Sequence, residues 1–280
     1  MPLELGSFAV SSLRAGYFRL DGGAMFGVVP KTLWQRHMPA DQHNRIVMAC
    51  NCLLVRTPDS LVLVDTGYGD HLNPKEREIY GIEDETTITT ALAQAGFAAQ
   101  DITHVVLTHL HFDHATGVLS GSADDLHPTF PQATYLVQEG EWHDALQGRS
   151  TMKTTYRPNE LDLLERSGQL QLIQGDTELG AGLTTFVTGG HTEHHQGVRI
   201  DTDDGTLVYP GDLVPMRTHL RLYWNMAYDM FPYQTLVRKR EFLAQAFKQQ
   251  WIIAWDHDPA TPFSTIQGEG ENYTANDVEI

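Results

Sequence analysis

Thr108-His109-Leu110-His111-Phe112-Asp113-His114 places three imidazoles and a carboxylate within six residues. The stretch follows the apolar run 105–107, which predicts a buried strand, so the polar side chains leave the end of that strand together. The two histidines that are two residues apart can bind one ion, while Asp113 and His114 can face a second. Imidazole and carboxylate groups suit mid-row divalent metals, zinc above all. The stretch therefore predicts a metal site, with a chance cluster among the 14 histidines as the alternative.

Further short motifs appear in the order that such a site requires. The heptad resembles the signature of the metallo-β-lactamase superfamily of hydrolases. Gly190-His191-Thr192 is similar to the family's second ligand segment, Pro210-Gly211-Asp212 to its bridging-carboxylate segment, and Asp256-His257-Asp258-Pro259 to its last ligand segment. Upstream, Leu63-Val64-Asp65-Thr66-Gly67 resembles the strand-end motif that supports the ligands. The resemblance covers about residues 21 to 260.

The resemblance implies two divalent metal ions, with Zn²⁺ as the first expectation and Fe, Mn or Co as alternatives. It implies a first site of His109, His111 and His191, a second site of Asp113, His114 and His257, and Asp212 as the bridge. Two such ions, about 3.5 to 4 Å apart, can hold a bridging water and lower its pKa toward about 7, which makes hydroxide available as a nucleophile. Asp113 and Asp212 are then the expected catalytic residues. Asp113 either carries the proton to the leaving group or serves as a ligand only.

Details of the motifs resemble the N-acyl-homoserine lactonases, the quorum-quenching branch, and the opening 21–27 resembles this branch and the organophosphate-hydrolase-like branch. The ring of Phe112 would line a pocket beside the metals, and His195 lies at the offset where lactonases carry another histidine. Pro215 stands where some lactonases have a catalytic Tyr. His219, Tyr223 or Tyr228 could replace it, and packing is the alternative role of each.

The apolar segment 213–233 begins directly after the bridging Asp and lacks both a two-residue alternation and a helical period. We therefore expect a loop that walls the substrate pocket, with Trp224 as the anchor for an acyl chain. The candidate pocket residues are Phe26, Phe112, His219, Tyr223, Trp224 and Tyr228.

The leading hypothesis is a hydrolase that opens lactone rings, of N-acyl-homoserine lactones in particular, by attack of a metal-bridging hydroxide. A phosphotriesterase, or another ester or thioester hydrolase of the same superfamily, is the enzymatic alternative. A metal-binding module without hydrolysis is the alternative from a different class, and the complete ligand set argues against it.

Composition limits the partners of the chain. Its 280 residues include 19 basic and 36 acidic ones, a formal charge of −17, which repels nucleic acid and anionic membrane surfaces. The N-terminus shows no signal segment and no long apolar run appears, so we expect a cytoplasmic protein with a small-molecule substrate. Cys50 and Cys52 are too close on one strand for an unstrained disulfide, and free thiols fit a reducing compartment. A homodimer is compatible with the sequence.

We predict an α/β fold, a four-layer αββα sandwich in which two mixed sheets face each other with helices outside. Strand, ligand and helix recur in two halves, about 1–168 and 169–280, and ligands from both halves argue for a single domain over 1–280. Periodicity predicts short strands at 8–10 and 17–20, a turn at 21–23, and a strand pair that closes the chain after 259. It also predicts helices at 86–95, 139–146, 160–166 and 234–249.

Overall fold

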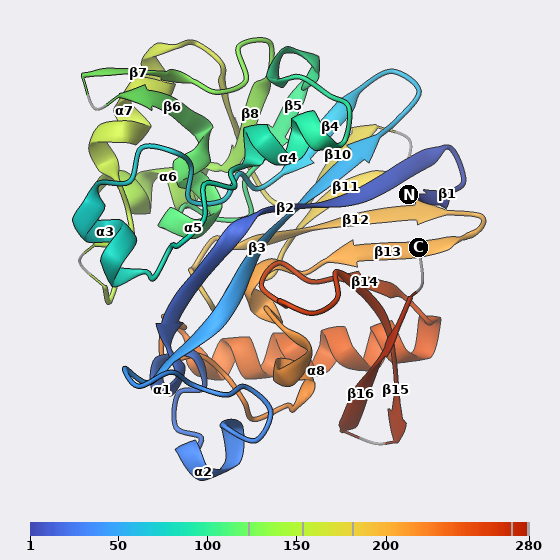
Figure 1. The fold of residues 1–280 in the computed structure, drawn as a ribbon. Helices are drawn as coiled ribbons and strands as arrows, with labels where there is room; N and C mark the ends of the chain where they lie inside the picture. Colours follow the sequence, from blue (N-terminus) through green and yellow to red (C-terminus); the bar gives the residue numbers. More distant parts are fainter. Residues whose placement is uncertain (123, 153, 181, 270, 279–280) are drawn as a thin grey trace.

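Two seven-stranded sheets form the centre of the molecule (Figure 1). The computed structural model describes residues 1–122, 124–152, 154–180, 182–269 and 271–278. The first sheet has the order β1 (Leu3–Leu5), β2 (Phe8–Asp21), β3 (Arg45–Arg56), β4 (Leu61–Val64), β5 (His104–Val106), β8 (Thr134–Gln138) and β9 (Leu170–Ile173). The second has the order β10 (Thr177–Gly180), β11 (Leu183–Val187), β12 (Gln196–Thr202), β13 (Gly205–Tyr209), β14 (Ile252–Ala254), β15 (Phe263–Glu269) and β16 (Asn272–Asp277).

Both sheets are mixed. In the first, β4, β5, β8 and β9 run parallel while β1 to β4 pair antiparallel; in the second, only β13 and β14 run parallel. The chain crosses from the first sheet to the second at 174–176. The expected boundary between the halves, at 168/169, lies ahead of β9, which still belongs to the first sheet.

Strand alternation sorts the apolar side chains into layers. On β3, Leu53 and Val55 face the core between the sheets, whereas Cys52 and Leu54 belong to the core on the outer face of the first sheet. Successive strand residues point to opposite faces, so a strand that is apolar throughout is covered on both sides.

Helices cover the two outer faces. The first sheet is covered by α4 (Ile88–Gln94), α6 (Glu139–Leu146) and α7 (Pro158–Arg166), and the second by the long α8 (Pro232–Gln249) (Figure 1). The predicted four-layer αββα sandwich and its four helices are confirmed. Among the described residues no helix is both long and apolar enough to cross a membrane.

Shorter elements lie at the rims of the sheets. They are α1 (Gly22–Met25), α2 (Lys31–Trp34), α3 (Pro74–Ile79), α5 (Phe112–Ala115), the hairpin β6 (Leu119–Ser122) and β7 (Asp125–Pro128), and the 3₁₀ turns η1 (Ala99–Asp101), η2 (Thr116–Val118), η3 (Gly211–Leu213) and η4 (Arg217–Leu220).

The N-terminal region differs from the sequence prediction. The two expected strands are one strand, β2, whose pairing register with β3 shifts between Arg14 and Tyr17. Gly16 lies at this bulge with φ +119°, and a Cβ there would come within 1.8 Å of the Tyr68 hydroxyl. A bulge interrupts the alternation that defines a strand in sequence, which explains the split prediction. The expected turn at 21–23 is the start of α1, capped by the Asp21 carboxylate, which accepts from Ala24 N.

Candidate metal centre

The ends of two parallel strands position the first ligand segment. Because β4 and β5 are neighbours, Asp65 and the 108–114 segment leave the same edge of the sheet. The Asp65 carboxylate accepts from Thr108 N at 2.8 Å and lies 2.9 Å from His114 Nδ1. Asp65 itself has φ +59°, a conformation that few non-glycine residues adopt and that tends to be found at functional sites. The buried carboxylate of Asp65 therefore fixes both ends of the 108–114 segment.

The first group of donors is His109, His111, His191 and Asp212, all buried, with ligand atoms within 4.8 Å of one another. His191 Nε2 lies 3.0 Å from His111 Nδ1 and 3.0 Å from Asp212 Oδ2. His109 Nε2 lies 3.8 Å from the same carboxylate oxygen. The side chains come from β5's ligand loop, the turn after β11 and the turn after β13, so both sheets contribute.

The second group centres on His114, His257 and the same Asp212. His114 Nε2 lies 3.1 Å from His257 Nε2, which is 3.3 Å from Asp212 Oδ1. Two further carboxylates reach this group: Asp113 Oδ2 is 3.6 Å from His257 Nε2, and Asp256 Oδ2 is 3.9 Å away. All seven ligands expected from the sequence thus lie together, and Asp212 faces both groups. Asp256, which sequence reasoning passed over inside its motif, is an eighth candidate.

These donors fit divalent cations. Among the described residues, His109 Nε2, Asp212 Oδ1 and Asp256 Oδ2 are buried without a hydrogen-bond partner, an arrangement that is costly unless something else binds them. Burial, and then the surrounding imidazoles, hold the pKa of His109 well below its usual value. Burial would also lower the pKa of His191, but Asp212 and Asp229 raise it to about 10. Neutral imidazole is the form that binds a metal, so His109 is ready to do so at neutral pH.

Hydrogen bonds from outside the two groups orient the ligand rings. His191 Nδ1 lies 3.0 Å from Asp229 Oδ1, and His257 Nδ1 lies 2.8 Å from the Ala49 carbonyl oxygen. His195 is no member of either donor group; its Nε2 accepts from the backbone N–H of Asp212 at 3.1 Å. Such outer contacts fix the tautomer and the direction of each ligand.

Glu141, on α6, joins three segments around the centre and was missed by sequence reasoning. Its buried carboxylate accepts from Thr192 Oγ1 at 2.6 Å, from the Tyr156 hydroxyl at 3.0 Å and from Leu110 N at 3.1 Å. Burial raises its pKa, and these three donors oppose the rise. No motif surrounds Glu141. Asp229 was also missed, although the sequence carries one signal: it is the only acidic residue in the apolar segment 213–233.

A cavity of about 230 Å³ opens directly beside the donors. His111, Asp113, His191, Asp212 and His257 form its polar side. The other side is largely apolar and is formed by Leu20, Met25, Met48, Ile79, Tyr80, Phe112, Met152, Thr154, Thr155, Met226 and Tyr228. We call these eleven residues the cavity wall. Of the predicted pocket residues, the cavity wall includes Phe112 and Tyr228.

The other predicted pocket residues lie elsewhere. Phe26 is fully buried between Trp34 and His219, and His219 Nε2 donates to the Met25 carbonyl oxygen at 2.9 Å. Tyr223 and Trp224 line a different, larger cavity of about 980 Å³. The chain turns at η4 before it returns to the donors, and this turn carries the middle of segment 213–233 away from them.

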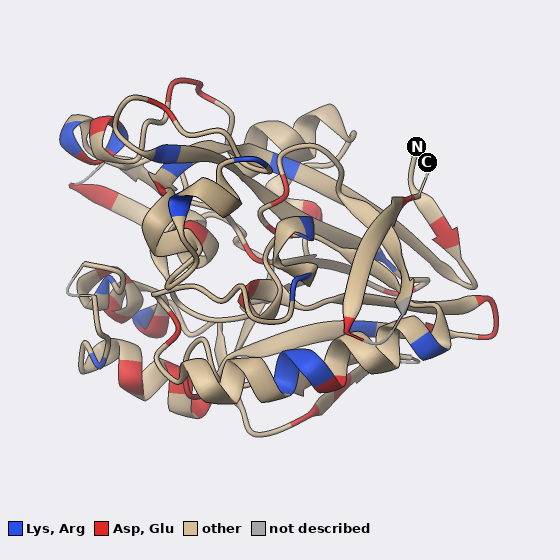
Figure 2. Cartoon of the chain, turned by 90° about the horizontal axis from the view of Figure 1, so that it is seen from below, with Lys and Arg blue, Asp and Glu red and all other residues tan. Residues whose placement is uncertain are grey.

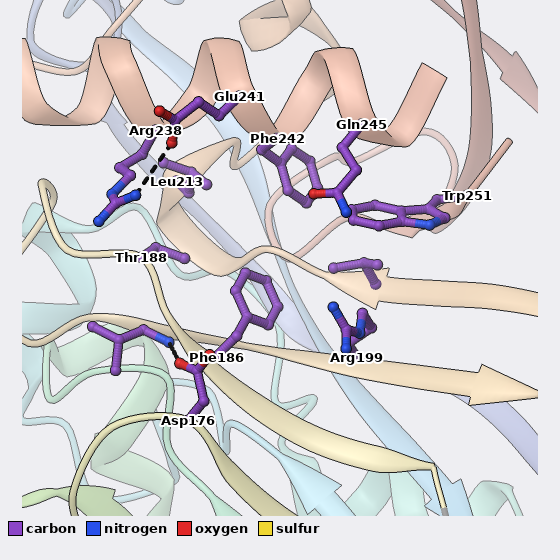
Figure 3. Close-up of a pocket in the computed structure, with 12 residues that line it drawn as sticks. Asp176, Phe186, Thr188, Arg199, Leu213, Arg238, Glu241, Phe242, Gln245 and Trp251 are labelled. Atoms are coloured by element: carbon purple, nitrogen blue, oxygen red, sulfur yellow. Dashed lines mark hydrogen bonds and ion pairs between the residues drawn. The ribbon is translucent and has the colours of Figure 1, made fainter. Parts of the chain in front are cut away.

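A third cavity, of about 230 Å³, lies between α8 and the outer face of the second sheet (Figure 3). Phe186, Arg199, Phe242 and Trp251 are among its lining residues, and none of the candidate ligands is. The cavity beside the donors is therefore the one at which metal chemistry could reach a bound molecule.

Comparison with known proteins agrees with this geometry. The family profile described as "Metallo-beta-lactamase superfamily" matches residues 45–257, which contain all the candidate ligands. The chain belongs to the metallo-beta-lactamase superfamily. An N-acyl homoserine lactonase of Bacillus cereus is 27% identical over 167 residues, 56% of this chain and 60% of the relative. A probable metallo-hydrolase of Mycobacterium tuberculosis is 27% identical over 209 residues, 68% of this chain and 66% of the relative. The chain thus aligns with less than two thirds of the length of these relatives.

Solved structures match over nearly the whole chain. A probable metal-dependent hydrolase from Staphylococcus aureus superimposes with a TM-score of 0.88 at 28% identity, covering 99% of this chain and 100% of the other. AidC, a dizinc quorum-quenching lactonase, superimposes with a TM-score of 0.82 at 22% identity, covering 100% and 97%. The second match shows the common fold.

Proposed function

We propose that this protein is a dinuclear-metal-dependent hydrolase that opens lactone rings, with N-acyl-homoserine lactones as the substrate class. The observation that carries the proposal is a pair of buried donor groups that share Asp212 and border an apolar cavity. Further support comes from the lactonase relative and from AidC, which was solved with the product N-hexanoyl-L-homoserine.

His109, His111 and His191 would hold one ion, and His114, His257 and Asp113 the other, with Asp212 contacting both. When bound, two divalent ions would supply Lewis acidity and would lower the pKa of a bound water molecule. Zn²⁺ is the proposed metal because imidazole-rich sites suit it and because AidC is a dizinc enzyme.

Asp113 is the proposed carrier of the proton. Its carboxylate borders the cavity and lies 3.6 Å from His257 Nε2, so it would contact a substrate held in that cavity beside the donors. In lactone hydrolysis a water oxygen bonds to the carbonyl carbon, the ring C–O bond breaks, and the ring oxygen leaves as an alkoxide that takes up a proton. Asp113 would accept the proton from the water and deliver it to that oxygen.

Tyr228 is the proposed donor to the substrate oxygen, in place of the Tyr that Pro215 replaces. Its side chain lines the cavity with Asp113 and Asp212, and among the described residues its hydroxyl has no hydrogen-bond partner. Burial, and then Asp21 and Asp113, raise the pKa of Tyr228, so the phenol keeps its proton at neutral pH. The two other candidates for this role are placed less well. His219 Nε2 donates to the Met25 carbonyl oxygen, and Tyr223 is 64% exposed at the larger cavity.

Both thiols are free and buried, and we propose a cytoplasmic location on that ground. The test of the function combines elemental analysis with a substrate panel. Purified protein should contain near two equivalents of metal and release acid from N-acyl-homoserine lactones faster than it hydrolyses a paraoxon-type triester. Faster triester hydrolysis would favour a phosphotriesterase, and two equivalents of metal without either activity would favour a binding module.

A further inference from the structure

Lys239, in the middle of α8, is a buried cation with neutral partners. Its side chain is 1% exposed, and its Nζ donates to the Trp224 carbonyl oxygen at 2.7 Å and to Asn225 Oδ1 at 3.3 Å. In the part of the chain that the structure describes, no carboxylate lies within 4.0 Å of this ammonium group. The neighbouring Arg238 instead pairs with Glu241 at the surface (Figure 3). Burial of an ammonium group without a carboxylate partner costs free energy, so we expect the contacts of Lys239 to serve a compensating role.

The two acceptors of Lys239 begin a loop, 224–231, whose other end contacts the His191 segment. Met230 N donates to the His191 carbonyl oxygen and Phe231 N to that of Gly190, both at 2.9 Å. Asp229 Oδ1 lies 3.0 Å from His191 Nδ1. The loop therefore runs from the Lys239 ammonium group to the ring of a candidate metal ligand.

The start of α8 completes this unit. Gly190 has φ +92°, and a Cβ there would come within 2.6 Å of Thr235 Oγ1, so the helix packs directly against the turn that carries His191. The same helix supplies Lys239 one turn further on. The field of Lys239 also reaches Asp229: burial lowers the pKa of Lys239 to about 7, and Asp229 opposes that change. Several positions along α8 are basic (Figure 2). Among the basic residues of this helix, Lys239 is buried.

We propose that Lys239 is a positioning residue for the metal centre: it fixes loop 224–231 and, through Asp229, the orientation of His191. The proposal rests on the proposed metal centre. It also assigns loop 224–231 a double task, because Met226 and Tyr228, between the two anchored ends, belong to the cavity wall. Loss of the Lys239 anchor should therefore affect metal affinity and substrate binding together.

The test is Lys239→Met, with Lys248→Met as its matched control, because Lys248 is exposed on the same helix. Metal-free protein is titrated with Co²⁺ against a chelator of known affinity, and the visible absorption of the cobalt form is recorded. Lys239→Met should bind the metal about 10-fold more weakly and show an altered cobalt spectrum, whereas Lys248→Met should match wild type. A purely structural lysine would lower the melting temperature and leave affinity and spectrum unchanged, which would overturn the proposal.

A double-mutant cycle tests the route. Asp229→Asn should weaken metal binding by itself, and Lys239→Met combined with Asp229→Asn should be no weaker than the worse single variant, because both act on His191 through one loop. Effects that multiply would overturn the proposal. Should Lys239→Met fail to fold, Asn225→Ala decides the question, since it removes one acceptor of the ammonium group from a half-buried side chain. Unchanged Co²⁺ affinity in that variant would overturn it.

The outcome is separable from that of the proposed function. Wild type that binds no metal refutes the metal centre itself. Wild type that binds two ions, beside a Lys239→Met variant of equal affinity and spectrum, refutes only the role of Lys239.

Discussion

The donor groups and the cavity wall meet at one end of the two sheets, yet they are held in place differently. Buried neighbours fix several of the donor rings, as Asp65 fixes His114 and Asp229 fixes His191. The wall is assembled from distant segments that include the end of α3 and the stretch before α7, and an ion-pair network joins these two helices: Arg157 lies 2.7 Å from Glu76 and 2.9 Å from Glu160. The part of the wall on α3 and before α7 can therefore change without disturbing the donors, whereas loop 224–231 contributes to both. A superfamily can then vary substrates around one metal chemistry.

The largest expected effect comes from the carboxylate that both donor groups share. Asp212→Ala should lower kcat more than about 100-fold and reduce the metal content, because it removes a proposed metal ligand. Loss of a residue that only hydrogen-bonds to a ligand already costs about 10–100-fold in metal affinity or activity. Phe112→Ala is the comparison from the wall and should keep both metals while KM rises. Elemental analysis and steady-state kinetics on the two variants check this. Near-wild-type turnover in Asp212→Ala would contradict the shared role.

The donors were accessible to sequence reasoning because chemistry constrains their spacing. Residues 109–114 supply four of the seven expected ligands, and each later ligand follows an apolar run that predicts a strand end. The helix expected at 139–146 is α6 to the residue. The helical period of apolar residues and the position of a ligand at the end of a strand are both local features of the sequence. They can therefore be predicted without knowledge of tertiary contacts.

The residues of the cavity wall could not be predicted from the sequence in the same way. Segment 213–233 does start at the metal centre, but only Met226 and Tyr228 from it line the cavity, while Tyr223 and Trp224 face another. An irregular segment has no period that tells where a side chain points. Its path depends on tertiary contacts such as that of Lys239 with Trp224, which pair residues 15 apart and leave no local pattern.

The second prediction uses pH to loosen the wall. His71 lies 3.1 Å from Glu160 and 3.6 Å from Asp70; burial would lower its pKa, but these two acids raise it to about 9. Because the pKa of His71 is higher in the folded than in the unfolded protein, protonated His71 stabilises the fold. This stabilisation is complete at pH values below the unfolded-state pKa, near 6.5, and is lost as pH rises through about 9. Between pH 7 and 10 the loss should be on the order of 2–3 kcal/mol.

The measurement is the melting temperature of wild type and His71→Gln at pH 7 and pH 10. Wild type should lose several degrees more than the variant, since each kcal/mol corresponds to about 2–4 °C in a domain of this size class. Metal content should stay equal in both, because His71 lies in the network of α3 and α7 and not among the donors. Parallel declines in the two proteins would show that His71 does not hold the wall.

The third prediction concerns Glu141, which joins the donor loops to the stretch that leads into the wall. Glu141→Gln puts an N–H₂ group where one acceptor oxygen stands, so one of its three donors loses its partner at a cost of about 1–3 kcal/mol. Thermal unfolding should show a drop of several degrees. Glu139→Gln, on the same helix but half-buried, is the control and should stay close to wild type. Equal melting temperatures for both variants would mean that the buried carboxylate does not couple the segments.

The smallest expected effect separates the two cavities. Ile79 is 55% exposed at the rim of the cavity beside the donors, whereas Trp224 lines the other cavity and packs on Phe26 and Arg221. Burial of a methylene group contributes about 0.8 kcal/mol. A lactone whose acyl chain crosses the rim should therefore bind a few-fold more weakly when the Ile79 side chain is shortened. Ile79→Ala should therefore raise KM more for long-chain than for short-chain lactones, and Trp224→Ala should leave that preference unchanged. Kinetics with lactones of two acyl lengths on both variants check this. If only Trp224→Ala alters the preference, the acyl chain lies in the larger cavity and the donors' cavity takes the ring alone.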